Sequence, residues 1–171
     1  MMTRYDDTLQ HERRLYLLLG VICVALLGGA LYLQYGRGED PCPLCILQRY
    51  AYALIAIFAF GAAASRSAAG IGVARWLSML AALGGAGAAG YLIWVQSHPS
   101  MSCGYDAVEA FVDGLPTARW LPSVFKVQGL CQTVYPPLLG LSLPVWSLIG
   151  FVLILLALLL HRPLRHPSQS R

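Results

Sequence analysis

The segment DPCPLCILQRYAYALIAIFAFGAAA, residues 40–64, decides the fold. It opens with two prolines and two cysteines, and a largely apolar run follows at 46–64. A helix of about 20 residues crosses the ~30 Å hydrocarbon core of a bilayer. Lipid offers the backbone no hydrogen-bond partners, so a run that enters it must form a helix. We therefore predict a transmembrane helix with a cysteine pair at one end.

Three further apolar runs of similar length lie at 15–33, 76–96 and 141–160. Hydrophobic residues make up 57% of the chain and charged residues only 12%, about half of the share typical of soluble domains. We predict an all-α integral membrane protein, a four-transmembrane-helix bundle that forms a single membrane domain over residues 1–171. The run at 15–33 is too long, and too poorly followed by small-residue cleavage chemistry, for a removed signal peptide.

The basic residues predict the orientation, because cytoplasmic loops of membrane proteins are enriched in Lys and Arg. Four spans place both termini on one side of the membrane, together with the loop at 65–75. That side carries most of the twelve basic residues: Arg4, Arg13, Arg14, Arg66, Arg75, Arg162, Arg165 and Arg171. We therefore expect cytoplasmic termini and two outer loops, at about 34–45 and 97–140. The net charge of +4 reflects this topology and predicts no nucleic-acid partner.

The cysteines gather in the outer loops. Cys42 and Cys45 lie in the first and Cys103 and Cys131 in the second, in a compartment that permits disulfides. The long segment between Cys103 and Cys131 is typical of a disulfide loop, whereas C-x-x-C is a redox or metal spacing. A zinc site and two purely structural disulfides are the alternatives, but an oxidising loop is a poor place for four thiolates, so we predict no metal. Cys23, within the first helix, is interpreted as a buried hydrophobe without a role.

The stretch PCPLC predicts how the second helix begins. Pro43 suits the first helical position, where its missing N–H is not needed. Cys42 is then the N-cap, and Cys45 lies in the first turn. The positive end of the helix dipole favours the thiolate at both positions. A cysteine with a lowered pKa is a good leaving group and a good nucleophile in disulfide exchange, so we predict a redox-active pair.

Arg49 shares one face of this helix with Cys42 and Cys45, at ~100° per residue. An arginine about one turn into the membrane is costly, and such residues are usually functional. The alternative is that its side chain snorkels to the interface and has no chemical role. Our hypothesis is that Arg49 donates hydrogen bonds to an electron acceptor held beside Cys45.

The nature of that acceptor follows by elimination. No G-x-G-x-x-G follows a predicted strand and no C-x-x-C-H occurs, so no nucleotide or haem motif is present. A membrane dithiol still needs somewhere to send two electrons, and lipid-soluble quinone (ubiquinone or menaquinone) is the available choice. His98, near the outer end of the third helix, is a further candidate for contact with a quinone oxygen. A solvated loop histidine is the alternative.

The second outer loop contains an amphipathic segment. Val108, Phe111 and Val112 recur at helical spacing between acidic residues, and Trp120 follows in RWLPSVF. This pattern predicts one or two short amphipathic helices resting on the membrane surface. The alternative is a helix packed on its own bundle. Either arrangement brings Cys131 close to the plane of Cys42.

Several motifs together resemble the DsbB family of disulfide-generating proteins of the bacterial inner membrane. They are CPLCILQR at the second helix, Cys103 opening the second loop, LPTARWLPSVF, GLC at Cys131, and LGLSLPVW before the fourth helix. The resemblance covers nearly the whole chain. It implies four helices with cytoplasmic termini and an activity that oxidises a periplasmic DsbA-like protein of the thioredoxin fold.

The resemblance also implies a relay among the four loop cysteines. Cys103 and Cys131 would form the disulfide that the reduced partner attacks, with Cys103 in the transient mixed disulfide. Cys131 would then exchange with Cys42 and free Cys45 as a thiolate against quinone, helped by Arg49. Two alternatives stay open at this point. One is a vitamin K epoxide reductase-like enzyme, in which C-x-x-C would follow the loop cysteines, and the other is a scaffold whose disulfides only staple loops.

Overall fold

The computed structural model describes residues 2–65, 67–98 and 105–160, which are almost entirely helical. The helices are α1 (Met2–Arg37), α2 (Pro43–Ala64), α3 (Ala68–Ser97), α4 (Tyr105–Asp113), α5 (Pro116–Trp120), α6 (Pro122–Phe125) and α7 (Leu143–Leu160). Within these ranges, α1, α2, α3 and α7 are long and apolar enough to cross a membrane. The predicted all-α fold with four transmembrane helices is confirmed.

The helix bounds differ from the predicted ones where the chain leaves the apolar runs. α1 continues to Arg37, beyond the predicted end at 33, and α3 begins at Ala68, ahead of the predicted start at 76. Polar and small residues flank the apolar part of each helix there, and their backbone groups continue the helical hydrogen bonds. Hydropathy marks only the part of a helix that matches the hydrocarbon layer. As a result, the first outer connection shrinks to residues 38–42.

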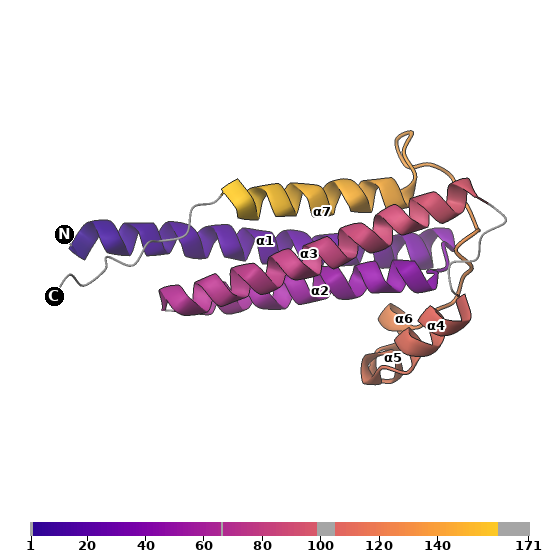
Figure 1. Ribbon diagram of the computed structural model, residues 1–171, viewed down its shortest axis with the longest axis horizontal. Helices are drawn as coiled ribbons and strands as arrows, with labels where there is room; N and C mark the ends of the chain where they lie inside the picture. Colours follow the sequence, from indigo (N-terminus) through magenta and orange to yellow (C-terminus); the bar gives the residue numbers. More distant parts are fainter. Residues whose placement is uncertain (1, 66, 99–104, 161–171) are drawn as a thin grey trace.

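The four long helices lie side by side along the length of the molecule (Figure 1). The extensive contacts join α1 with α2, α2 with α3, and α3 with α7. The start of α1, the α2–α3 connection and the end of α7 lie at one end of the bundle, while α4, α5 and α6 lie at the other. This arrangement agrees with termini on one side; which side faces the cytoplasm stays a prediction.

The bundle core lies between α1, α2, α3 and α7. Tyr52 of α2 stacks on Phe151 of α7 with ring centroids 4.2 Å apart, and both are buried. Gly85 of α3 faces the Phe151 ring so closely that a Cβ there would overlap it. Small residues allow such close helix approach in membranes. Cys23 is fully buried among these apolar side chains, in line with its interpretation as a small hydrophobe.

The second loop forms three short helices, where the sequence predicted one or two. Val112 of α4 and Phe125 of α6 are buried against Ile46 at the start of α2. The Phe125 ring also stacks on Tyr50 of α2, with centroids 4.4 Å apart. Trp120 remains 79% exposed on the outer face. The segment therefore packs on its own bundle with one face and exposes an apolar surface on the other. That this surface rests on the membrane stays a prediction.

Candidate active site

Cys42 and Cys45 lie at the first turn of α2 with their sulfurs in contact. Cys42 is the N-cap residue, and its Sγ accepts a hydrogen bond from the backbone N–H of Cys45 at 3.4 Å. Pro43 occupies the first turn, as the sequence predicted. The two Sγ atoms are 2.9 Å apart and both cysteines are free thiols. Cys42 is buried, whereas Cys45 is partly exposed. The pair is therefore in its reduced form.

The thiol–thiol contact raises the pKa of Cys42. The hydrogen bond to Cys45 is the main cause and burial adds to it, whereas the backbone N–H groups of Cys45 and Leu44 act in the opposite direction. The prediction that the helix start favours the thiolate at both cysteines is therefore wrong for Cys42. The two sulfurs are in hydrogen-bond contact, and either of them can donate.

Arg49 lies one turn deeper in α2 and is only 6% exposed. Its Nη1 donates to Gln34 Oε1 of α1 and to the Val124 carbonyl of α6, both at 2.8 Å. A third, longer hydrogen bond runs from Nη2 to the Ala30 carbonyl at 3.5 Å. These hydrogen bonds hold the guanidinium between α1 and α6. A role beside an electron acceptor and the snorkelling alternative both stay predictions. In the described part of the chain, its other N–H groups have no hydrogen-bond partner.

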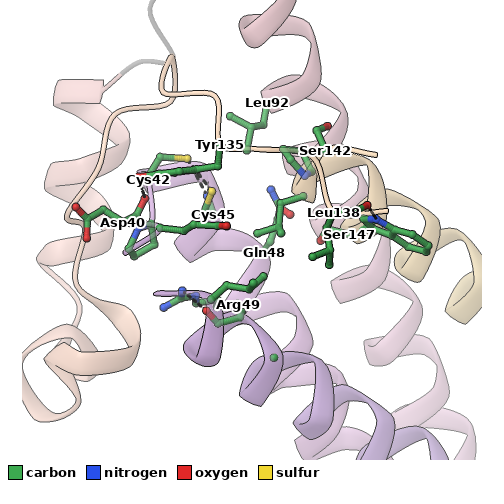
Figure 2. A pocket seen from close by; sticks show the side chains of 18 of the residues that line it. Asp40, Cys42, Cys45, Gln48, Arg49, Leu92, Tyr135, Leu138, Ser142 and Ser147 are labelled. Atoms are coloured by element: carbon green, nitrogen blue, oxygen red, sulfur yellow. Dashed lines mark hydrogen bonds between the residues drawn. The ribbon is translucent and has the colours of Figure 1, made fainter. Parts of the chain in front are cut away.

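Cys131 lies next to Cys42. It is disulfide-bonded and 2% exposed, and it belongs to an apolar cluster with Cys42, Leu44, Leu92 and Val95. Figure 2 shows the neighbouring Tyr135 segment running above the cysteine pair. Cys103, the other loop cysteine singled out from the sequence, lies outside the described residues. The structure thus brings three of the four candidate cysteines to one place, and Cys23 belongs to a different apolar cluster.

A backbone clamp holds the Cys131 segment against the first outer connection. The N–H groups of Gln128 and Gly129 both donate to the Pro41 carbonyl, at 3.0 and 3.1 Å. Gly129 packs so closely on Asp40 that a Cβ would lie 2.5 Å from the Asp40 carbonyl oxygen. Only glycine allows this approach without displacing the backbone. The clamp therefore fixes the position of Cys131 relative to Cys42.

A cavity of about 580 Å³ opens beside the cysteine pair. Cys42, Cys45, Gln48 and Arg49 form its wall on α2, and Figure 2 shows these side chains together. The other walls are largely apolar: Leu26, Gly29, Ala30 and Leu33 of α1, Leu138, Leu143, Pro144 and Trp146 around the start of α7, and Leu92 of α3. The cavity lies between α1 and α7. The extensive helix contacts run from α1 to α2, from α2 to α3 and from α3 to α7, so α1 and α7 are the first and last helices of this series. Its size and lining suit a largely apolar ligand.

His98 does not line this cavity, in contrast to the role considered from the sequence. It is the exposed C-cap of α3, and its ring lies beside Trp94 with centroids 5.0 Å apart. Its Nδ1 contacts the Trp94 carbonyl and the Ser97 hydroxyl, both at 3.0 Å. Gln48 lines the cavity instead. The sequence contains a signal for this role. Gln48 follows Cys45 by three residues, and that spacing puts two side chains on one helix face.

Comparisons with known proteins bear on the same residues. The family described as "Disulfide bond formation protein DsbB" matches residues 12–161. The chain belongs to the DsbB family. The matched range contains the cysteine pair, Arg49 and Cys131, so the resemblance inferred from the motifs is confirmed. The match favours a disulfide bond formation protein of the membrane over a vitamin K epoxide reductase-like one.

Curated DsbB relatives are similar to the chain over most of its length. "Disulfide bond formation protein B" of Burkholderia thailandensis (strain E264) is 56% identical over 165 residues, covering 94% of this chain and 98% of the relative. The protein of that name from Burkholderia pseudomallei (strain 1106a) is 56% identical over 153 residues, 90% of each chain. "Disulfide bond formation protein B 1" of Pseudomonas savastanoi pv. phaseolicola is 55% identical over 150 residues, 86% of this chain and 89% of the relative.

Proposed function

We propose that this DsbB-family chain reoxidises a DsbA-like protein of the thioredoxin fold in the bacterial periplasm and passes the electrons to membrane quinone. It would lie in the inner membrane with both termini in the cytoplasm. One observation carries the proposal: a reduced Cys42–Cys45 pair lies beside a disulfide-bonded Cys131 and lines a largely apolar cavity. The pair can therefore exchange with a disulfide and also face an acceptor that arrives through lipid.

The resemblance to the DsbB family implies the order of the thiol steps. The reduced partner attacks the Cys103–Cys131 disulfide at Cys103, which forms a mixed disulfide and releases Cys131. The Cys131 thiolate then attacks Cys42 of an oxidised Cys42–Cys45 pair and releases Cys45. The partner's second thiol resolves the mixed disulfide at Cys103, and Cys103 then regenerates the loop disulfide by displacing Cys42 from Cys131. Each cycle moves two electrons from the partner to Cys42 and Cys45. The described form, with Cys42 and Cys45 reduced and Cys131 disulfide-bonded, matches the state that follows this transfer.

The residues around the cavity fit a quinone. A bound quinone supplies an acceptor for two electrons and two protons. Arg49 is held by Gln34 and Val124 and keeps N–H groups free to donate to a ring carbonyl. Because its position is set before any ligand arrives, it stabilises developing negative charge without reorganisation. Cys45 faces the cavity, Cys42 supplies a proton, and the apolar walls exclude water from both sulfurs.

The direction of electron flow requires an acceptor of this kind. A DsbA-type oxidant has a reduction potential of ~−120 mV, and for two electrons ~30 mV corresponds to ~1.4 kcal/mol. A structural disulfide, with a potential below about −300 mV, cannot oxidise such a partner. The cavity beside Cys45 provides access to a stronger oxidant dissolved in the membrane. A scaffold with stapling disulfides needs neither that cavity nor a free C-x-x-C pair.

Trapping tests the partner step. We expect Cys131→Ser, which leaves Cys103 unpaired, to accumulate a mixed disulfide between Cys103 and a DsbA-like protein whose resolving cysteine is replaced by alanine. The trapped partner has no thiol to release itself, so the adduct persists on non-reducing gels. Mass spectrometry of the linked peptides identifies the cysteine. The matched variant, Cys103→Ser, leaves Cys131 free and buried, and we expect no adduct from it. Adducts at Cys131 and none at Cys103 would reverse the two assigned roles.

A further inference from the structure

Gln48 has a buried amide nitrogen that no group in the described part of the chain satisfies. The residue is only 6% exposed and lines the cavity beside Cys45. Its Nε2 is buried and, within the residues that the structure describes, has no hydrogen-bond partner. Buried amides almost always have partners, because an unpaired donor keeps the full cost of its lost hydration. An amide left unpaired in a cavity wall therefore points to a polar group on a ligand.

Gln48 and Arg49 lie on opposite sides of Cys45. At ~100° per residue, Gln48 is rotated about 60° to one side of Cys45 and Arg49 about 40° to the other, both one turn deeper. The contacts agree with this geometry, since Arg49 reaches α1 and α6. Gln48 instead lies between Cys45 and the residues around the start of α7, Ser142 and Ser147 (Figure 2). Two donors thus flank the space next to the Cys45 sulfur.

We propose that Gln48 is a positioning residue that donates its amide N–H to one carbonyl oxygen of the quinone, while Arg49 donates to the opposite one. This inference rests on the proposed function and assigns a further positioning residue to it. Donors on two sides of Cys45 match a para-quinone, which has carbonyl oxygens on opposite sides of its ring. Gln48 and Arg49 would then hold the ring at both oxygens beside Cys45.

The two donors act on the charge that develops during oxidation of the pair. Oxidation of the Cys42 and Cys45 thiols forms one S–S bond and releases two electrons and two protons. The quinone takes up all four as its two carbonyls become hydroxyls. A guanidinium N–H at one oxygen and an amide N–H at the other stabilise negative charge on both, in a cavity with largely apolar walls. Gln48 thereby sets the affinity and the orientation of the ring.

Quinone binding to the disulfide form of the protein tests the inference without turnover. Gln48→Met keeps the length of the side chain and removes its N–H donors. In lipid nanodiscs, with ubiquinone carrying one isoprenoid unit as the probe, we expect the Kd to rise about five- to tenfold. Quenching of tryptophan fluorescence reports binding, because Trp146 lines the cavity. Gln10→Met makes the same change at an exposed site on α1 and should leave the Kd unchanged.

Two further readouts separate a ligand contact from a packing role. In infrared difference spectra, one carbonyl band of the bound quinone should move to higher frequency in Gln48→Met, since a lost hydrogen bond stiffens that C=O bond. Without quinone, the melting temperature should stay equal or rise, because the unpaired amide is gone.

Each outcome has one meaning. Wild-type protein that binds no quinone overturns the proposed function itself. Wild-type protein that binds while Gln48→Met binds equally well, or binds more weakly with unchanged carbonyl bands, overturns only the role of Gln48.

Discussion

Replacement of Cys45 by serine should abolish quinone reduction by a reduced DsbA-like partner, with a loss of about 10³-fold or more. Cys45 lines the cavity one turn from Arg49, so we expect its sulfur to be the atom that delivers electrons. A serine hydroxyl cannot form a disulfide with Cys42, and the pair then has no oxidised state. Turnover is measured from the fall in ubiquinone absorbance, with purified protein in nanodiscs and the reduced partner in excess.

Cys23 provides the matched control for this substitution. It is also a free cysteine in a transmembrane helix, but it is buried in the core and does not line the cavity. We expect Cys23→Ser to keep the turnover rate within about threefold of wild type, with some loss of melting temperature from a hydroxyl in an apolar core. Turnover by Cys45→Ser above a tenth of the wild-type rate would contradict the assignment. A purely structural role predicts a modest change in stability and no quinone chemistry in either protein.

Gly129→Ala should slow electron transfer from the Cys103–Cys131 pair to the Cys42–Cys45 pair. An added Cβ would lie 2.5 Å from the Asp40 carbonyl oxygen and 3.0 Å from its carbonyl carbon, so the backbone clamp on Pro41 must open. Cys131 then moves away from Cys42. A displacement of about 1 Å between reacting groups can lower a rate by ~10², and we expect a loss of that size in overall turnover.

The reaction step that becomes slow distinguishes this effect from a general loss of structure. The partner should still reduce the Cys131 disulfide at a rate close to wild type, while electrons fail to reach Cys42. Acid quenching, alkylation and peptide mass analysis follow each disulfide over time. Gly28→Ala serves as the control and should leave both steps unchanged, because an added Cβ at this helical glycine has no neighbouring atom within 4 Å. Equal slowing of both steps would show that the clamp has no specific role in coupling.

Much of the architecture could be predicted from local patterns. Apolar runs of transmembrane length predicted α1, α2, α3 and α7, and Pro43 predicted a helix start with Cys42 as the N-cap. Both signals are local, because one depends on the thickness of the bilayer and the other on the missing N–H of proline. The helix ends were predicted less well, since polar residues such as Arg37 continue a helix beyond the apolar layer.

The details of the site depended on contacts between distant segments. The position of Cys131 beside Cys42 is fixed by backbone hydrogen bonds from Gly129, and no periodicity or motif reports such bonds. His98 was considered for the quinone because of its chemistry, but α3 ends with that ring outside the cavity. The pKa of Cys42 depends on a sulfur–sulfur contact that outweighs the backbone N–H groups at the helix start. Contacts between distant segments, helix ends and side-chain rotamers decide these features, and sequence spacing determines none of them.

A single-turnover experiment tests the central claim most directly. Protein with Cys42 and Cys45 reduced is mixed anaerobically, in nanodiscs, with one equivalent of ubiquinone and no partner. We predict that one quinol forms per chain while a Cys42–Cys45 disulfide appears at the same rate, by absorbance and by mass analysis of alkylated peptides. Quinone that stays oxidised beside the reduced pair, or quinol that forms without that disulfide, would contradict the account.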